Sequence, residues 1–281
     1  MPELPEVQTI VGDLLPHLTG RTITDVRLAW PKAVAAPDVE GFVLGLRGQR
    51  IVGMERRGKY IALALESGRY LVLHLKMTGA LLWRQASDPP DRFTRTVFAL
   101  DGGHELRFTD IRKFGRLWLV DDLAQALPAL GPEPLDGAFT AERLAQALKG
   151  RRAPIKACLC DQKVVAGVGN IYADEALFLA GVHPLRRADG LRRAEVARLR
   201  DSIVTVLEQG IRNRGTSFDT YRDGHGNKGS NQLAVRVYQR DGEPCPRCGT
   251  AIRRTVVGQR SAHFCPNCQP RRPLKRGLAA P

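Results

Sequence analysis

Four cysteines form the clearest candidate for a chemical site. They fall in two Cys-x2-Cys pairs, Cys245 with Cys248 and Cys265 with Cys268, and sixteen residues separate the pairs. Two turns of this kind can place four thiolates tetrahedrally around one Zn²⁺, and the spacing is typical of zinc ribbons. Two disulfides are the alternative, but the chain opens without a secretion signal. The sequence predicts one structural zinc ion and no small-molecule cofactor.

A glycine-rich turn is the second candidate. Residues Gly167-Val168-Gly169-Asn170 come directly before an apolar stretch, Ile171–Ala180. Glycines let a ligand approach the backbone closely, and the first amides of a helix attract phosphate. An Asn170 side chain that only caps the helix would also explain the motif. The nearby cations Arg151 and Lys156 favour phosphate binding.

The charge of the chain points to a polyanionic partner. The formal net charge is +14 and the isoelectric point is near 10.0. Residues 1–133 hold 17 basic and 16 acidic residues (17 − 16 = +1), whereas residues 134–281 hold 26 and 13 (26 − 13 = +13). A basic second half fits nucleic acid, although a merely solvated basic surface would have the same composition. Because the sequence contains no long apolar run, we expect a cytoplasmic, nucleoid-associated protein that makes no membrane contact.

The first half of the chain predicts a helix followed by an antiparallel β-sandwich. Apolar residues recur at helical spacing from Val7 to Leu15, and Pro5 suits the first turn. Short alternating or apolar runs then predict strands at Thr22–Leu28, Tyr60–Leu65, Tyr70–Leu75, Thr94–Leu100 and Glu105–Thr109. Turn residues at 66–68 and 101–103 join neighbouring strands as hairpins. The predicted fold class is therefore α+β.

The second half predicts helices followed by the cysteine module. Helical patterns cover Phe139–Leu148, Pro154–Asp161, Ile171–Ala180 and Arg192–Ile211. Cys158 and Cys160 fall in one of these helices and are expected to be packing residues. The predicted domains are 1–120, a β-sandwich; 121–138, a linker; 139–231, a helical domain ending in a polar loop; 232–270, a zinc finger; and 271–281, a disordered tail.

Three motifs resemble one enzyme family. Met1-Pro2-Glu3-Leu4-Pro5-Glu6-Val7 resembles the N-terminus of formamidopyrimidine-DNA glycosylases, and residues 161–175 resemble their helix–two-turn–helix segment. The cysteine module is similar to their C-terminal ribbon. The resemblance runs from Pro2 to about Gln269. It implies a bifunctional glycosylase and AP lyase that acts as a monomer on damaged double-stranded DNA and removes oxidised purines.

The resemblance implies four catalytic residues. The secondary amine of Pro2, free once Met1 is removed, would attack C1′ of the damaged nucleotide. Glu3 would transfer protons, Lys59 would contact lesion and phosphate, and Arg260 would assist the second elimination. Judged alone, Pro2 is an ordinary helix-start residue and Glu3 a carboxylate that compensates the helix dipole.

Further residues are implied as DNA contacts. Met77, Arg112 and Phe114 match the residues that fill the gap left by an extruded base, a task suited to apolar wedges and an arginine. His74 would contact phosphate, as would Arg151, Lys156 and Asn170. By periodicity alone, Met77 and Phe114 would more often be core residues.

Two segments depart from the family pattern. Residues 91–95 lack a DNA-contacting histidine that many relatives carry there, and the loop 217–231 is no clear match to the lesion-capping loop. An endonuclease VIII-type enzyme for oxidised pyrimidines is the nearest alternative, and a zinc-dependent DNA-binding protein without activity is the alternative from another class. Leu4, Met77 and Phe114 favour the purine-directed branch.

Overall fold

The computed structural model describes residues 1–271 and divides the chain into two compact units. The first unit comprises Met1–Ala129 and Glu208–Leu233, and the second comprises Leu130–Leu207 and the described residues from Ala234 onward. The boundary falls within helix α6 (Arg193–Arg212), so residues of the predicted 139–231 segment belong to both units. Beyond Arg271, the predicted disordered tail (271–281) lies outside the described residues.

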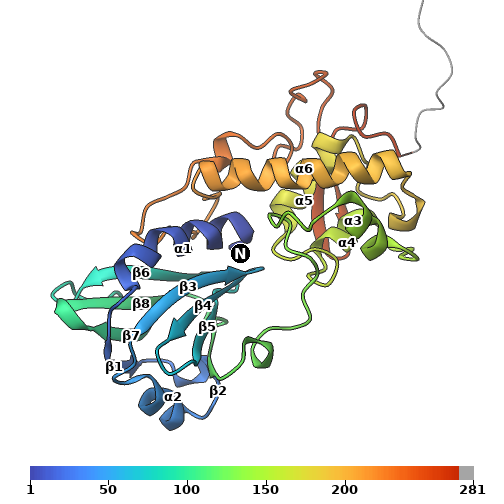
Figure 1. Cartoon of the computed structure of the whole chain (residues 1–281). Helices are drawn as coiled ribbons and strands as arrows, with labels where there is room; N and C mark the ends of the chain where they lie inside the picture. The colour runs from blue at the N-terminus through green and yellow to red at the C-terminus, as the bar shows by residue number, and fades with distance from the viewer. Residues whose placement is uncertain (272–281) are drawn as a thin grey trace, which may run out of the picture. The chain divides into compact units, whose positions relative to one another are not determined.

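Two β-sheets form the body of the first unit (Figure 1). The four-stranded sheet has the order β1 (Ile23–Leu28), β7 (Thr94–Leu100), β8 (His104–Asp110), β6 (Gly79–Gln85). The five-stranded sheet has the order β2 (Val34–Ala36), β9 (Arg116–Val120), β5 (Tyr70–His74), β4 (Tyr60–Leu65), β3 (Ile51–Arg57). Among the described strands, β2 and β9 run parallel and all other pairs are antiparallel.

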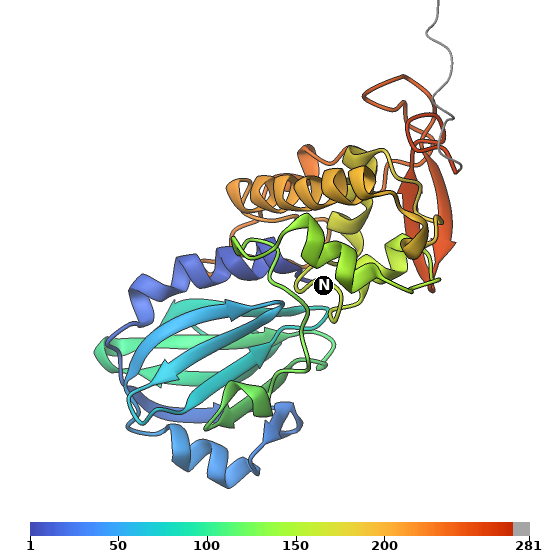
Figure 2. The ribbon, with the colours of Figure 1, turned by 45° about the vertical axis from the view of Figure 1, so that its right-hand side comes forward.

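One apolar core joins the sheets to the first helix. Helix α1 (Leu4–Leu18) buries Ile10 and Leu14 completely, and Phe98 of β7 and Leu63 of β4 belong to the same core. Leu15, counted in the predicted apolar stripe, is 37% exposed. Helices α1 and α2 (Val39–Leu46) lie on opposite sides of the sandwich (Figure 2). The predicted helix and sandwich are confirmed.

Both predicted hairpins are present. Residues 66–69 connect β4 to β5, and residues 101–103 connect β7 to β8, each as an antiparallel pair. Gly68 has φ +82° and Gly102 has φ +70°, so both turns use a backbone conformation that favours glycine. Residues 121–127, within the predicted linker, pack partly onto the outer face of the five-stranded sheet through Ala126 and Leu123.

The second unit combines helices with a β-hairpin. Its elements are α3 (Ala141–Leu148), α4 (Ile155–Cys160), α5 (Asn170–Ala180), the first part of α6, and the strands β10 (Arg253–Val257) and β11 (Arg260–Phe264). Phe178 of α5 packs with Ile252 and two of the cysteines. The α+β class is confirmed. Among the described residues, no helix combines the length and apolarity needed to cross a membrane.

Candidate active site and DNA interface

The amino end of α1 is held in place by one buried carboxylate. One Glu6 oxygen accepts a hydrogen bond from the backbone N–H of Glu3 at 2.8 Å, and the other accepts from the N–H of Thr216 at 2.7 Å. Pro2 and Glu3 are buried, whereas Met1 is 40% exposed. The first residues of a chain are usually mobile, but here they are fixed to the fold.

Lys59 and His74 come from adjoining strand ends. Gly58 and Lys59 form the two-residue turn between β3 and β4, and Gly58 has φ +57°. The next residue, Tyr60, pairs with His74 of β5, and their rings meet edge to face at 4.5 Å. Both Lys59 and His74 are almost completely buried. The hairpin register therefore brings these two predicted site residues together.

His74 is a neutral histidine with a defined tautomer. Burial lowers its pKa to about 3, and the positive charges of Lys76 and Lys59 act in the same direction. Its Nδ1 accepts a hydrogen bond from the backbone N–H of Lys76 at 2.9 Å. The proton of the neutral ring must therefore sit on Nε2, which leaves an N–H donor suited to a phosphate oxygen.

Met77 and Phe114 lie on two loops of the first unit and are not core residues. Their side chains are 40% and 48% exposed, which argues against the packing alternative. Asp110 ties the loops together: it accepts hydrogen bonds from the Thr78 hydroxyl at 2.5 Å and from the backbone N–H of Arg112 at 3.1 Å. The Arg112 guanidinium stacks over the Phe114 ring at 4.7 Å. The three predicted void-filling residues thus lie on two exposed loops that Asp110 holds together by hydrogen bonds.

The polar segment 217–231 is ordered by a buried aspartate. Asp223 accepts hydrogen bonds from the backbone N–H groups of His225 and Asn227, at 3.0 and 2.8 Å, and pairs with Arg214 at 2.6 Å. Arg214 also pairs with Asp13 of α1 at 2.8 Å. The base of this loop is therefore fastened to the first helix.

Asn170 is not the N-cap residue of α5, so the alternative that it only caps this helix is wrong. Gly169 is the N-cap residue of α5, and Asn170 is the first residue of the helix. The Asn170 Nδ2 instead lies 3.4 Å from the Tyr238 hydroxyl and 3.3 Å from the Ser261 hydroxyl. The glycine-rich turn is braced by another side chain, since Gln162 accepts from Gly167 N–H and donates to the Val168 carbonyl.

Lys156, one of the predicted DNA contacts, is buried and paired. Its residue is 1% exposed, and its Nζ lies 2.6 Å from a carboxylate oxygen of Asp174, which is also buried. Asp174 further accepts a hydrogen bond from the backbone N–H of His263 at 2.9 Å. Lys156 and the backbone of β11 therefore share the Asp174 carboxylate, and the predicted contact of Lys156 with phosphate stays a prediction. Arg151 is partly exposed and is paired with Asp161 at 3.0 Å.

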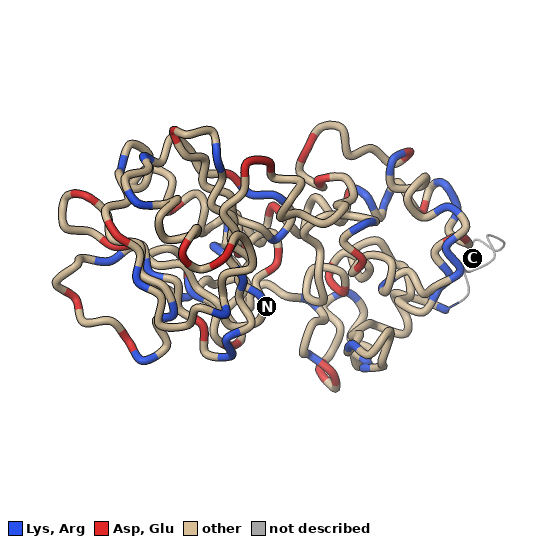
Figure 3. The backbone as a smooth tube through the Cα atoms, turned by 90° about the horizontal axis from the view of Figure 1, so that it is seen from below, with Lys and Arg blue, Asp and Glu red and all other residues tan. Residues whose placement is uncertain are grey.

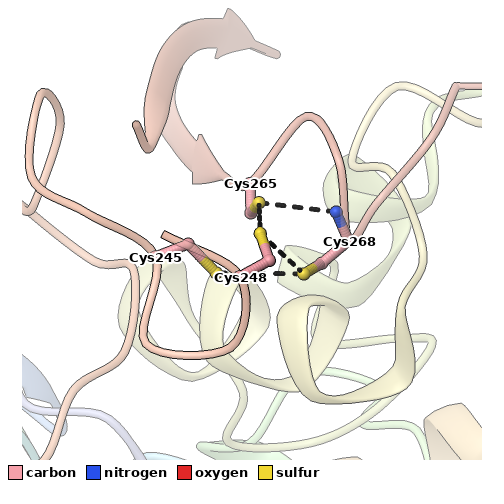
Figure 4. Close-up of side chains that lie close together, drawn as sticks. All are labelled: Cys245, Cys248, Cys265 and Cys268. Atoms are coloured by element: carbon pink, nitrogen blue, oxygen red, sulfur yellow. Dashed lines mark hydrogen bonds between the residues drawn. The ribbon is translucent and has the colours of Figure 1, made fainter. Parts of the chain in front are cut away.

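The four predicted zinc ligands converge in the second unit (Figure 4). Their sulfur atoms all lie within 4.8 Å of one another, and the closest approaches are 3.5 to 3.8 Å. Tetrahedral thiolates at ~2.3 Å from Zn²⁺ would be roughly 3.8 Å apart, whereas a disulfide needs about 2 Å. The donor set therefore fits one structural zinc ion, as predicted, and the disulfide alternative is wrong.

The cysteine module presents Arg260 at the tip of its hairpin. Gly258 and Gln259 form a two-residue turn with φ +55° and +63°, the conformation that matches the twist of a tight hairpin. Arg260 is the first residue after the turn and is exposed. The module is anchored by Arg247, whose guanidinium donates to the carbonyls of Phe178 and Leu179 near the end of α5. Figure 3 shows that both units carry basic segments, interspersed with acidic ones.

Comparisons with known proteins cover almost the whole described chain. Residues 1–117 match the formamidopyrimidine-DNA glycosylase N-terminal domain, residues 130–222 match the H2TH domain of the same enzymes, and residues 242–271 match a zinc finger found in FPG and IleRS. A formamidopyrimidine-DNA glycosylase of Herpetosiphon aurantiacus is 49% identical over 96% of this chain and 100% of its own length. One from Moorella thermoacetica is 52% identical over 90% and 94%.

The chain belongs to the formamidopyrimidine-DNA glycosylase family. The predicted family and enzyme class are confirmed. Two solved structures of the family are similar throughout: MutM (FPG) from Thermus thermophilus has a TM-score of 0.86 at 40% identity, covering 97% of this chain and 100% of that one. The Lactococcus lactis FPG in complex with Fapy-dG containing DNA has a TM-score of 0.88 at 33% identity, covering 95% and 100%.

Several residues that hold the site in place were not predicted from the sequence. Glu6, Asp110 and Asp174 are buried carboxylates that accept backbone N–H groups from other segments. A signal existed for Glu6, because a carboxylate three residues after the N-cap is typical of a capping box. Asp110 also binds Thr78, 32 residues away, and Asp174 binds His263, 89 residues away, and no local pattern identifies these distant partners.

The zinc site predicts that loss of one cysteine ligand reduces both metal content and DNA binding. The Cys248→Ser variant should lose its zinc equivalent and, with it, the order of the hairpin that carries Arg260, so binding of duplex DNA should fall as well. Metal content per chain and DNA affinity are the measurements. Cys160→Ser is the matched control and should keep both. Full DNA affinity in a zinc-free Cys248→Ser protein would contradict the assignment.

His74 makes a prediction about pH. The unfolded chain protonates this histidine near its ordinary pKa of 6.5, whereas the folded protein resists protonation down to about pH 3. The unfolded state therefore binds more protons in this window, so the stability contribution is complete above pH 6.5 and is lost as the pH falls towards 3. His74→Gln should remove roughly 2 kcal/mol of the stability lost between pH 7 and pH 5. Urea unfolding at both pH values tests this, and equal losses in the two proteins would refute it.

Proposed function

We propose that the chain excises oxidised purines, 8-oxoguanine and formamidopyrimidines, from double-stranded DNA and then cleaves the strand by β,δ-elimination. The observation that carries the proposal is the fixed amino end of α1, where Pro2 and Glu3 are buried and Glu6 holds the backbone. The Lactococcus lactis relative bound to Fapy-dG containing DNA supports the same substrate class. We place the enzyme in the cytoplasm, acting as a monomer on the nucleoid.

Pro2 is the proposed nucleophile. After removal of Met1, its neutral amine forms a bond to C1′ of the damaged nucleotide, and the bond from C1′ to the base breaks with its electron pair leaving on the base. The Glu3 carboxyl supplies a proton to the opening sugar ring. The resulting iminium acidifies C2′–H, so loss of that proton expels the 3′ phosphate, and a second elimination expels the 5′ phosphate. A free N-terminal amine has a pKa of about 8, which supplies neutral nucleophile near pH 7.

The other site residues bind and orient DNA in this proposal. Lys59 and the Nε2–H of His74 bind phosphate beside the lesion, and Arg260 binds the phosphate that leaves in the second elimination. Asn170 and Arg151 contact the backbone from the second unit. Met77, Arg112 and Phe114 enter the duplex, where exposed apolar side chains and a stacked guanidinium replace the stacking and pairing of the extruded base.

The proline assignment is tested by borohydride trapping. A protein beginning at Pro2 should form a trapped adduct that mass spectrometry maps to Pro2, whereas a protein that retains Met1 should bind DNA but form none, because its nitrogen is an amide. Glu3→Gln should keep the nucleophile and lose base excision by a hundredfold or more, in line with the ~10²–10⁴-fold typical of general acid catalysis. An adduct on Lys59, with Pro2 unmodified, would overturn the mechanism and leave DNA binding untouched.

The void-filling assignment is tested with two substrates. Met77→Ala should slow excision of 8-oxoguanine from duplex DNA by tenfold or more and slow cleavage of a preformed abasic site much less, since an abasic site has no base to extrude. Single-turnover rates on both duplexes are the measurement. Val52→Ala, which also shortens a half-exposed apolar side chain, is the control. Equal losses on the two substrates would mean that Met77 only packs.

A further inference from the structure

A groove in the second unit lies outside the proposed active site and DNA contacts. It has a volume of about 460 Å³ and runs between α3 and the segment that leads into α6 (Figure 1). Its floor is apolar, because the buried side chains of Leu148, Ala188 and Val196 line it. Asn170, Arg260 and the zinc ligands do not line it. The groove therefore has no task in the proposed chemistry.

The groove is open because small residues face it from α3. Ala141 and Ala145 lie one helical turn apart, and Gly150 follows the end of the helix. Helix α3 has eight residues, so a groove along its whole length is ~12 Å long at ~1.5 Å per residue. About four residues of an extended peptide span this length, at ~3.3 Å each. The dimensions therefore suit a short peptide segment.

The segments that form most of the walls carry an excess of positive charge. Residues 141–152 and 186–193 contain eight Lys and Arg side chains and two acidic ones (8 − 2 = +6). One of the acids, Glu142, lies 3.6 Å from Arg193, and both side chains are exposed. An exposed ion pair at this distance is weak, so Arg193 can exchange Glu142 for a carboxylate of a ligand. The walls favour an acidic partner.

Two further cations beside the groove have no acidic partner. The other acid, Asp189, accepts two hydrogen bonds from the Arg187 guanidinium, at 3.0 and 2.7 Å. These bonds, and more weakly the charge of Arg152, hold the pKa of Asp189 below its ordinary value. Lys149, which lines the groove, and Arg152 are exposed and form no ion pair with any of residues 1–271. Their charges are available to a ligand.

An apolar floor between cationic walls distinguishes the possible partners. The backbone of a duplex offers phosphates and sugars, which have no apolar side chain to place on Leu148 and Val196. A second copy of this chain has a formal net charge of +14 and would bring positive charge to a positive surface. A peptide that combines carboxylates with apolar side chains satisfies both features, because its carboxylates pair with the cations while its apolar groups leave water.

We propose that this groove binds an acidic peptide segment of a partner protein, with apolar side chains on the floor and carboxylates at Lys149 and Arg152. The proposal is independent of the proposed chemistry, because no residue that lines the groove takes part in base excision or strand cleavage. Asn170 and Arg260 do not line the groove, so the protein should bind this segment and duplex DNA at the same time. The groove would thus hold another protein beside the damaged site.

The first part of the test selects from a phage-displayed library of random peptides on the full-length, zinc-loaded protein. The enriched sequences should combine several Asp or Glu residues with at least two apolar residues. The most enriched peptide, synthesised with a fluorescent label, is then the probe, and fluorescence anisotropy measures its Kd. An excess of undamaged duplex should not displace this peptide.

The second part compares variants of the groove with a matched control. Ala145→Trp fills the groove from an exposed position, and Lys149→Glu reverses a charge that lines it, so each should raise the Kd of the peptide about tenfold or more. Arg143→Glu reverses an exposed charge of α3 that does not line the groove, and should keep the Kd within about twofold. Circular dichroism and zinc content report that all three variants are folded.

The outcomes separate the possible occupants of the groove. Acidic, apolar peptides whose binding is weakened by Ala145→Trp and Lys149→Glu, but not by Arg143→Glu, support the proposal. Absence of enrichment, enrichment of neutral or basic peptides, or equal Kd values in Lys149→Glu and Arg143→Glu would overturn it. Displacement of the peptide by duplex would assign the surface to DNA, and a dimer in sedimentation velocity that Ala145→Trp abolishes would assign it to a second copy; both results reject the proposal. Peptide binding needs no damaged base, so it is unaffected if no Pro2 adduct forms.

Discussion

The geometry of the candidate active site depends on the two hydrogen bonds that the Glu6 carboxylate accepts. One fixes the backbone of Glu3, next to the proposed nucleophile, and the other fixes Thr216, at the start of the polar loop. A nucleophile at a chain terminus has few covalent constraints, so its position must come from contacts. Because Glu6 is completely buried, both bonds are shielded from water and are stronger than they would be at the surface. The same side chain couples the terminus to the loop that begins at Thr216.

Buried carboxylates play a similar part elsewhere in the chain. Asp110 fixes the loops that expose Met77 and Phe114, Asp174 holds the strand that carries Arg260, and Asp223 orders the segment 217–231. Burying a carboxylate is costly unless its oxygens accept several hydrogen bonds, and each of these accepts backbone N–H groups that a loop would otherwise leave unsatisfied. The exposed functional side chains thus lie on segments whose backbone N–H groups donate to buried carboxylates. These hydrogen bonds fix the backbone, while the functional side chains stay accessible.

Local sequence patterns predicted the features that depend on residues close together in the chain. The Cys-x2-Cys spacing identified the zinc ligands, and alternation identified β4 and β7 with their observed bounds. β3 was not predicted, because Gly53 and the charged end of that strand interrupt its alternation. Lys156 was predicted to contact DNA because it is a cation near the glycine-rich turn, but its burial against Asp174, eighteen residues away in the chain, was not predicted. Contacts between distant segments decide whether a charged side chain faces solvent, and no window of the sequence contains that information.

Counts of charged residues along the sequence also fail to predict where the folded protein presents a positive surface. The first 133 residues are almost neutral by count, which placed the positive field in the second half of the chain. In the folded first unit, however, many carboxylates are occupied by particular arginines, in the pairs Arg21–Asp101, Arg27–Glu105, Arg47–Asp25, Arg69–Asp121 and Arg107–Glu105. The exposed cations Lys32, Arg92 and Lys113 form no ion pair with any of residues 1–271. A segment with almost no net charge can therefore present a positive surface, because the fold decides which charges cancel and which remain available to a phosphate backbone.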